Sequence, residues 1–575
     1  MRVSLQGLPI GIRVANLYCW AKLLIFGVAA ASVLRLPAVA GEAYHGQPLH
    51  NGIVLPKVWP PQRPADSNEP QPVPYLEQPP AVIPIDDGRQ LLVDDFLVES
   101  TTLKRSFHRP VPHPGNPILR PDRPWEESLA MPYSDGVWYD PQDQQFKMWY
   151  MAGTRTTCYA RSRDGVQWEK PQLDVRPGTN IVLEAPRDST TVWLDLAEKD
   201  PARRYKLVRA ASPNKFWQML LHYSPDGIHW GPPVAASGPS WDRTTIFYNP
   251  FRQVWAYSVR GHRRTGEQFF RLRLYKEAAS LVEAGQWKFF SDDIVDGKWA
   301  PGEPVFWAGP DRLDPRHPEQ GLVQPPQLYN LDALAYESLL LGFFSIWQGP
   351  DNRVCAERKM EKRNEVLLAF SRDGFHWHRP DRKPFLGVDD RPGAWNRGNV
   401  QSVGGGCLVV GDRLFLYYSG RSYGEPAGRK ASTGLAVLRR DGFASLDAGP
   451  EGGSLTTRPI LFHGKHLFVN VCSDQGELQV EAIDASDRVI APFTREGCSA
   501  IRTDSTRTVV RWDGASDLSS IVGRPVRFRF HLRNGRLYAF WTSSDLSGAS
   551  NGYLAAGGPG LSGTRDAAKP SAHVQ

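Results

Sequence analysis

Two short segments of this chain align without a gap, and each begins with an acidic residue that could do chemistry. Asp188-Ser-Thr-Thr-Val-Trp-Leu-Asp195 corresponds to Asp242-Arg-Thr-Thr-Ile-Phe-Tyr-Asn249. Asp188 and Asp242 therefore open two equivalent units. A pair of carboxylates can serve as acid and as base or nucleophile. Alternatively, each aspartate caps its entry turn. Arg243 could keep its neighbour ionised, or bind an acidic ligand through its planar fork.

Two further acids lie in an apolar segment, Leu328–Glu337. Ionised Asp332 and Glu337 are costly there unless they are paired or line a pocket. They are five positions apart and so face opposite sides of a regular strand. Only one can point to a ligand, and Asp332 is nearer the start. Glu337 could instead mark the turn at the far end.

Three more residues could bind a ligand at the outer units. Glu126 follows a tryptophan, whose ring can stack on a sugar, although such an acid also suits a solvated turn. Asn399 and Gln401 open the last unit and could bond hydroxyl groups. The predicted catalytic residues are thus Asp188, Asp242, Asp332 and Glu337, and the predicted binding residues are Glu126, Arg243, Asn399 and Gln401.

A turn motif, Ser-x-Asp-Gly-x-x-Trp, recurs in the chain at Ser162–Trp168, Ser224–Trp230 and Ser371–Trp377. Asp-Gly supplies a turn with positive φ between two strands, so these aspartates are predicted to be structural. Further unit openings lie at 131–139, 328–336 and 399–403. Repeats of this kind indicate an array or a propeller. We predict an all-β fold, with a five-bladed β-propeller over 86–450.

The pattern changes after Gly449, where apolar and polar residues alternate in five runs between 467 and 541. Alternation with one solvated face predicts a C-terminal β-sandwich over 451–546. The proline-rich residues 41–85 predict an extended linker, and residues 547–575 a flexible tail. Residues 277–283 are the one short helix expected.

These patterns resemble the five-bladed glycoside hydrolases of family 32, the invertase and levanase group, and the propeller of family 43. The resemblance rests on the Ser-x-Asp-Gly-x-x-Trp turns, on His113-Pro-Gly-Asn-Pro-Ile-Leu119, and on a family 32-like sandwich from Gly453-Ser-Leu-Thr-Thr-Arg-Pro459 to Leu537-Tyr-Ala-Phe-Trp541. It covers residues 113–545. The family 32 motifs Asn-Asp-Pro-Asn-Gly, Arg-Asp-Pro and Glu-Cys are absent, so no catalytic residue carries over.

The resemblance implies a glycoside hydrolase that acts on a poly- or oligosaccharide with a carboxylate pair at the propeller axis. The pair would be about 5 Å apart for retention and about 6.5–9.5 Å for inversion. A non-catalytic carbohydrate-binding propeller and an interaction scaffold are the alternatives. No cofactor is predicted, and a structural cation in the channel stays open without a sequence signature.

The first 40 residues predict a cleaved signal peptide and a secreted or periplasmic protein. Basic residues precede an apolar run, Leu23–Leu34, and a small-x-small site ends at Ala40. Without the basic residues of this segment, the net charge falls from +7 to about +3. The remaining charge is dispersed, which excludes a nucleic-acid footprint, and no later segment predicts a membrane span.

Five cysteines follow the predicted signal, which itself contains Cys19. They are widely spaced and show no metal-binding pattern. Cys472 and Cys498 could pair in an oxidising compartment, but buried, inert thiols are the better expectation for most of them.

Overall fold

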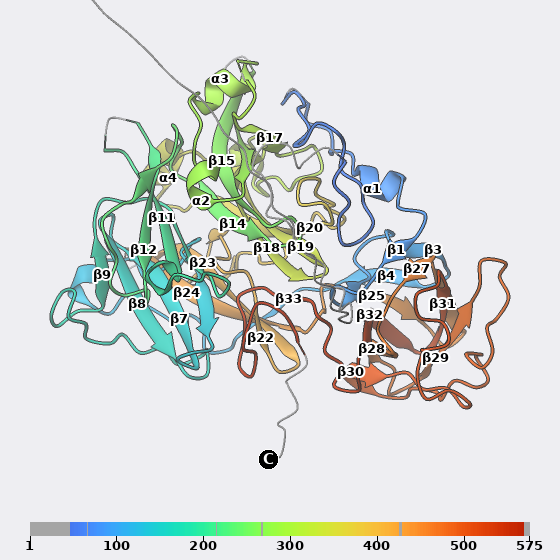
Figure 1. The fold of residues 1–575 in the computed structure, drawn as a ribbon. Coiled ribbons are helices and arrows are strands. Elements are labelled where there is room, and N and C mark those ends of the chain that lie inside the picture. The colour runs from blue at the N-terminus through green and yellow to red at the C-terminus, as the bar shows by residue number, and fades with distance from the viewer. Residues whose placement is uncertain are drawn as a thin grey trace, which may run out of the picture. The chain divides into compact units, whose positions relative to one another are not determined.

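The computed structural model describes residues 46–65, 67–213, 216–265, 268–298, 300–424 and 428–567. The predicted signal peptide lies outside this range. Antiparallel β-sheet dominates the described residues, which belong to one compact unit (Figure 1). The helices are short: α1 (Pro74–Glu77), α2 (Leu281–Ala284), α3 (Ser291–Val295) and α4 (Asn352–Arg358), with 3-10 turns η1 (Pro124–Glu126), η2 (Pro201–Arg203) and η3 (Gln320–Leu322). None of the described helices is long and apolar enough to cross a membrane.

Three four-stranded antiparallel sheets follow one another along the chain. The first contains β6 (Val137–Asp140), β7 (Gln145–Ala152), β8 (Thr156–Ser162) and β9 (Ile181–Glu184). The second contains β10 (Thr190–Leu194), β11 (Tyr205–Ala211), β12 (Gln218–Ser224) and β13 (Ala235–Ala236). The third contains β14 (Thr245–Asn249), β15 (Val254–Thr265), β16 (Gln268–Ala278) and β17 (Val305–Ala308). Neighbours in each sheet are consecutive in sequence, so each sheet is a meander.

A longer sheet contains the next strands. Its first group is β18 (Gln327–Glu337), β19 (Leu339–Gly349), β20 (Arg363–Ser371) and β33 (Tyr553–Leu554), and its second is β5 (Val111–Pro112), β21 (Asn399–Gln401), β22 (Leu408–Val410), β23 (Arg413–Gly424) and β24 (Gly428–Arg439). Only the parallel pairing of Asn364 with Asn399 joins β20 to β21. The sheet therefore divides into two antiparallel groups.

Hydrogen bonds connect the first strands of these five groups in a closed circuit, from β6 through β10, β14, β18 and the residues after β21 back to the segment before β6. The links, in that order, are Val192 N to Asp135 O (2.7 Å), Ser189 Oγ to Thr244 O (3.3 Å), Thr245 Oγ1 to Leu331 O (3.1 Å), Val403 N to Asp332 Oδ2 (3.1 Å) and Gly404 N to Tyr133 O (3.0 Å). Residues distant in sequence thus meet around one axis.

The repeated turn motif has the structural role that the sequence predicts. In the second copy, Asp226 accepts backbone hydrogen bonds from Ile228 (2.8 Å) and His229 (2.9 Å). Ser224 Oγ accepts the N–H of Gly227, which has φ +79°. The other two copies repeat these bonds. Each copy has glycine at this position because only glycine adopts this backbone at low cost.

We expect Gly227→Ala to destabilise the protein by about 1–3 kcal/mol, because a Cβ there would lie 2.4 Å from Cζ2 of buried Trp149. Gly178→Ala is the matched control, since Gly178 has the same φ and nothing within 4 Å of its Cβ position. Denaturant unfolding of both variants separates backbone strain from the clash. Equal losses would contradict the packing role of this turn.

Two further antiparallel sheets share one hydrophobic cluster, to which Leu467, Phe528 and Phe540 belong. One contains β2 (Gln90–Leu91), β4 (Lys104–Phe107), β25 (Ala444–Ala448), β28 (His466–Cys472), β30 (Asp504–Val509) and β32 (Gly535–Ser543). The other contains β3 (Val98–Thr101), β26 (Gly453–Thr457), β29 (Glu477–Ile483) and β31 (Arg527–Arg533). Apolar side chains from both sheets are thus buried together.

Strands that follow position 86 pair with strands close to or beyond position 450. Strands β2, β3 and β4 pair with β32, β26 and β25, which follow the five groups in sequence. Figure 1 shows the blue N-terminal strands beside the orange and red ones. Pairing of early strands with late strands depends on tertiary contacts, which local sequence patterns do not reveal.

The described parts of the expected linker and tail make specific contacts. Leu55 and Tyr75 are buried in the cluster shared by the two late sheets, and β1 (Ile83–Pro84) pairs with β27 (Ile460–Leu461). Near the C-terminus, β33 pairs with the end of β18. The predicted helix is shorter than expected and begins at Leu281, because Glu277 and Ala278 belong to β16.

The cysteines in the described residues include several deeply buried thiols. Cys472 and Cys498 are not bonded to each other, although their spacing allowed a disulfide. Cys158, Cys407 and Cys498 are buried, and burial raises the pKa of the Cys498 thiol to about 11. These three thiols are therefore unreactive, as expected.

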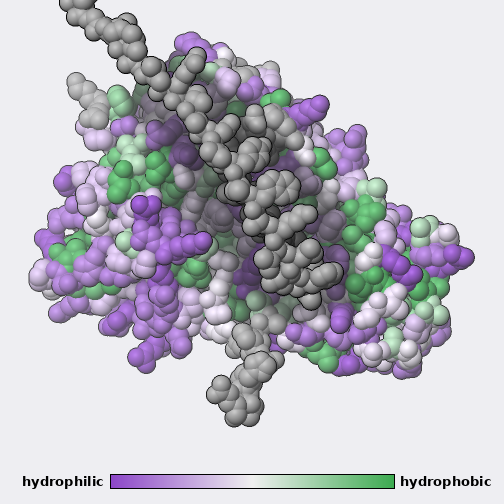
Figure 2. Space-filling view, in the orientation of Figure 1, coloured by the Kyte–Doolittle hydropathy of each residue, from purple (hydrophilic) through white to green (hydrophobic). Residues whose placement is uncertain are grey.

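On the face drawn in Figure 2, hydrophilic residues lie between hydrophobic ones over the sheets. Large apolar residues are exposed at scattered positions, such as Val111, Phe216 and Leu546. Scattered exposure of this kind is ordinary on protein surfaces. The polar groups at the strand ends are the more informative feature.

Candidate functional site

The end of the hydrogen-bonded circuit at which β10 and β14 begin is its mouth. Asp188 and Asp242 lie next to each other there, just before these two strands. The Ser189 hydroxyl donates to the carbonyl of Asp242, which joins the two segments. The carboxylate side chains are 29% and 30% exposed. Each aspartate forms an ion pair with an arginine: Asp188 Oδ1 lies 3.3 Å from Arg243 Nε, and Asp242 pairs with Arg260. Both carboxylates are therefore half-open and held by cations.

Arg243, predicted as a binding residue, is buried between two tyrosine rings. Its Cζ lies 4.2 Å from the ring centroid of Tyr133 and 5.8 Å from that of Tyr329. Burial acts to lower the pKa of Arg243, but Asp188 and the two tyrosines outweigh this and raise it. Arg243 thus stays charged beside Asp188.

Tyr329 lies among four cationic side chains at the same mouth. Lys362 Nζ is 5.5 Å and Arg271 Cζ is 5.4 Å from its ring centroid. Burial acts to raise the pKa of Tyr329, but Lys362, Arg243, Arg271 and Arg421 outweigh burial and lower the pKa to about 7. A phenol that titrates near neutral pH can transfer a proton there.

We expect Tyr329 to form its phenolate near pH 7, because the surrounding cations favour the charged form. Near-ultraviolet absorbance during a pH titration checks this, and Tyr329→Phe should remove the early step. Lys362→Met should move that step to higher pH, since one stabilising cation is lost. An early step that persists in Tyr329→Phe, or none below the ordinary tyrosine range of about 10, would contradict the assignment.

Asp332 lies inside the circuit rather than at its mouth. Its carboxylate accepts hydrogen bonds from Val403 N (3.1 Å) and Asn330 Nδ2 (3.0 Å). Burial raises the pKa of Asp332 against the effect of these bonds. The side chain joins β18 to the residues after β21, and it is a second group that could hold a proton.

Asn399 and Gln401 are fully buried on β21 beside the mouth. Asn399 Nδ2 donates to the carbonyl of Lys362 (2.9 Å), and so positions the segment that carries this lysine. Within the described residues, neither amide atom of Gln401 has a hydrogen-bond partner. Gln401 is thus a buried amide beside the mouth, without exposed surface for a ligand.

Glu126 does not lie with these residues, and the structure gives it a structural role. Its buried carboxylate accepts hydrogen bonds from the hydroxyl of Tyr150 (2.6 Å) and the N–H of Arg123 (2.9 Å), and it forms an ion pair with Lys170 (2.7 Å). These contacts fix the turn η1. The structure therefore does not bring Glu126, a predicted binding residue, together with the other predicted site residues.

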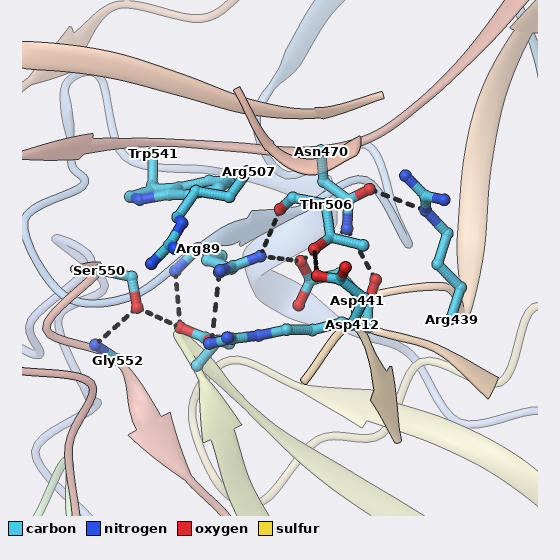
Figure 3. A network of polar contacts seen from close by, with 12 residues as sticks. Arg89, Asp412, Arg439, Asp441, Asn470, Thr506, Arg507, Trp541, Ser550 and Gly552 are labelled. Atoms are coloured by element: carbon cyan, nitrogen blue, oxygen red, sulfur yellow. Dashed lines mark hydrogen bonds and ion pairs between the residues drawn. The ribbon is translucent and has the colours of Figure 1, made fainter. Parts of the chain in front are cut away.

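Glu337 is likewise separate, in a buried ion network at the far end of β18. Its carboxylate receives the backbone N–H of Arg89 (3.1 Å), the hydroxyl of Ser550 (2.7 Å) and the guanidinium of Arg440 (3.1 Å). Figure 3 shows the network around Arg89, which also bonds to Asp441 (2.8 Å). Glu337 has no exposed surface, so the structure places it apart from the mouth, in a buried ion network.

Several residues at the mouth were not predicted: Tyr133, Arg260, Arg271, Tyr329, Glu361, Lys362 and Arg421. Tyr133 lies within the predicted unit opening at 131–139, and Tyr329 lies one position after Leu328, where another predicted unit opens. The openings of the repeats were thus a usable signal for the tyrosines. The cations lie on later strands of their groups or, for Lys362, just before β20, where the repeats gave no signal.

A cavity of about 590 Å³ borders this mouth, and Arg271 and Lys362 line it. A separate groove of about 1440 Å³ surrounds Trp395 and contains none of the predicted site residues. Its aspartates are already paired, since Asp389 Oδ2 lies 2.5 Å from Arg391 and Asp390 Oδ1 lies 2.8 Å from Arg363. We place the candidate site at the mouth, where Arg243 lies between the half-open carboxylate of Asp188 and the ring of Tyr329. No group of three or more His, Cys, Asp or Glu in the described residues could hold a metal ion.

No protein-family model and no curated protein matches this sequence. Among solved structures, the chain is similar to an N-acetylgalactosamine deacetylase from F. plautii, with 12% identity, a TM-score of 0.36 and coverage of 60% of this chain and 96% of that one. It is also similar to a glycosyl hydrolase from Bacteroides ovatus (13% identity, TM-score 0.35, 61% and 97%) and to a beta-fructofuranosidase from Schwanniomyces occidentalis (10%, 0.35, 76% and 97%). At these TM-scores the fold and the site have to be argued from the chain itself.

Proposed function

We propose that the five groups of strands are the blades of a five-bladed propeller, and that the two late sheets form a β-sandwich. The closed circuit of hydrogen bonds between the first strands supports the propeller, because inner strands surround the central axis in that fold. The shared hydrophobic cluster supports the sandwich. The mouth of the circuit is then one end of the propeller axis.

We further propose that the protein hydrolyses glycosidic bonds at this mouth. The observation that carries the proposal is the pair of half-open carboxylates, Asp188 and Asp242, just before two adjacent inner strands. Arg243 connects them to Tyr329, since it pairs with Asp188 and its Cζ lies 5.8 Å from the Tyr329 ring centroid. Glycosidic cleavage needs a proton donor and a carboxylate that activates water or attacks the sugar.

The proposed reaction divides these roles between the aspartates and Tyr329. The phenol of Tyr329 donates its proton to the glycosidic oxygen as the bond from that oxygen to the anomeric carbon breaks. Asp188 or Asp242 takes a proton from the water that adds to the anomeric carbon. Asp332, with its raised pKa, is the alternative proton donor. The protonated aspartate then releases its proton to solvent, and the phenolate takes one up, which restores both groups.

A non-catalytic carbohydrate-binding protein is the second candidate. It is favoured by the fact that both aspartates already form ion pairs with arginines. Aromatic rings at the mouth, those of Tyr133 and Tyr329, would serve a bound sugar in either case.

A polysaccharide panel tests the two candidates directly. Reducing-end release and binding are measured in parallel on the chain without residues 1–40. Release from at least one member supports the hydrolase. Binding without release from any member supports the binding protein instead, and absence of both contradicts either function.

We also propose that the protein is exported and cleaved after Ala40. The basic residues and the apolar run of the first 40 residues support this. Expression of the full chain followed by mass determination of the mature protein should give an N-terminus at Gly41. A protein that keeps Met1 in the cell would contradict export.

A further inference from the structure

The cavity of about 590 Å³ beside the mouth is assembled from several elements. Phe269 and Arg271 come from β16, Gln327 from β18 and Trp347 from β19, and Lys362 precedes β20. Trp347 pairs with Gln327 across β18 and β19, and so both side chains lie at one end of this hairpin. Strands β16, β18 and β19 thus form one side of the cavity, and loop residues and the start of α4 form the rest.

Two cations in this cavity have no carboxylate partner among the described residues. Arg271 donates to the amide oxygen of Gln327 and lies 5.4 Å from the Tyr329 ring, while its Nε is buried without a hydrogen-bond acceptor. Lys362 Nζ lies 5.5 Å from the centroid of the same Tyr329 ring. Other arginines of the mouth, Arg243 and Arg260, are paired with aspartates.

The remaining charges on the cavity do not neutralise this pair. Asp351 is engaged by its own helix, since its carboxylate accepts the N–H groups of Arg353 (2.9 Å) and Val354 (3.0 Å) at the start of α4. Arg353, a further cation on the rim, pairs with Glu357 at 3.0 Å. The cavity thus has an excess of positive charge close to the proposed reacting groups.

The chemistry of these side chains defines the ligand. The planar fork of Arg271 and the ammonium group of Lys362 suit an oxyanion, and charge-assisted hydrogen bonds are the stronger ones. The Trp347 and Phe269 rings offer aromatic surface to a sugar ring. A free inorganic anion would use only the cations, whereas an acidic sugar would use both features.

We propose that this cavity binds the carboxylate or sulfate group of an acidic saccharide, so that the substrate class of the protein is an anionic glycan. The inference rests on the proposed function, because it places the acidic group next to the glycosidic bond at the mouth. The same contacts would also serve a binding protein for such glycans.

Calorimetric binding of matched saccharides tests the proposal. Trigalacturonate is compared with its fully methyl-esterified, neutral form, and a sulfated disaccharide and inorganic sulfate are added as separate probes. We expect trigalacturonate or the sulfated disaccharide to bind at least about tenfold more tightly than the neutral form and than inorganic sulfate. Arg271→Gln and Lys362→Gln should each remove most of this preference. Arg358→Gln, an exposed arginine of α4 that pairs with Glu319, should retain it.

The outcomes separate this inference from the hydrolase proposal. Equal affinity for charged and neutral forms, no affinity for either acidic saccharide, or a preference unchanged in both cavity variants would overturn it. Inorganic sulfate binding as tightly as the saccharides would also overturn it, because the site would then recognise the anion alone. Selective binding without cleavage of any glycan would leave the inference standing while the hydrolase proposal fails.

Discussion

Asp242→Asn and Asp188→Asn are each expected to slow glycosidic cleavage by roughly 10²–10⁴-fold, because each removes a carboxylate from the proposed reacting pair. The loss should appear in kcat more than in KM, since asparagine keeps the size and the hydrogen-bonding oxygen. The side chains are half-open rather than buried, so the variants should fold. Initial rates of reducing-end release, together with unfolding curves, measure both effects.

Asp195→Asn is the matched control for these variants. Asp195 follows the other end of β10, is also partly exposed, and pairs with Lys206 at 2.9 Å. It should lose little activity, because it lies away from the mouth. Rates reduced equally in all three variants would show that loss of an ion pair, rather than loss of a reacting carboxylate, causes the effect.

Arg89→Met is expected to destabilise the protein by about 3–5 kcal/mol, because it leaves buried carboxylates without their cation. The Arg89 guanidinium bonds to Asp441 (2.8 Å) and to the carbonyl of Thr506 (2.8 Å), and Figure 3 shows it beside Trp541. Its Cζ lies 4.1 Å from the Trp541 ring. Equilibrium denaturant unfolding, compared with the wild-type chain, measures the loss.

An exposed ion pair provides the comparison for this network. Arg161→Met breaks the surface pair with Glu169 (3.0 Å) and should cost at most about 1 kcal/mol, since water screens such pairs. Glu337→Gln should lose stability in the same range as Arg89→Met, because the two side chains share the network. If Arg89→Met were as stable as Arg161→Met, the network would not stabilise the contact between the end of β18 and the late strands.

Local features of this fold could be predicted from the sequence. The Ser-x-Asp-Gly turns form because their bonds connect residues two or three positions apart, as between Asp226 and His229. The gapless alignment of two segments likewise predicted that Asp188 and Asp242 lie at neighbouring strands, because it too compares residues close together in sequence. Strands β2, β3 and β4 could not be assigned in this way, because their partners lie more than 300 residues later.

The candidate site was predicted only in part because burial depends on distant partners. Glu126 and Glu337 looked like acids free to react, but Lys170, Arg89 and Arg440 neutralise them. In the sequence, Tyr329 is an ordinary tyrosine in an apolar segment. In the structure, Lys362, Arg271 and Arg243 surround it and lower its pKa. The sequence pattern thus predicted the ends of the strands. The side chains that determine the charge and pKa of the residues there belong to other units.

The most direct test of the proposed site is a crystal structure of the Asp242→Asn chain with the tightest-binding saccharide. The proposal predicts a sugar ring at the mouth of the circuit, with a glycosidic oxygen near Tyr329 and Asp188. An acidic group of that saccharide should lie between Arg271 and Lys362. A saccharide bound instead only in the groove around Trp395, with the mouth empty, would contradict the account.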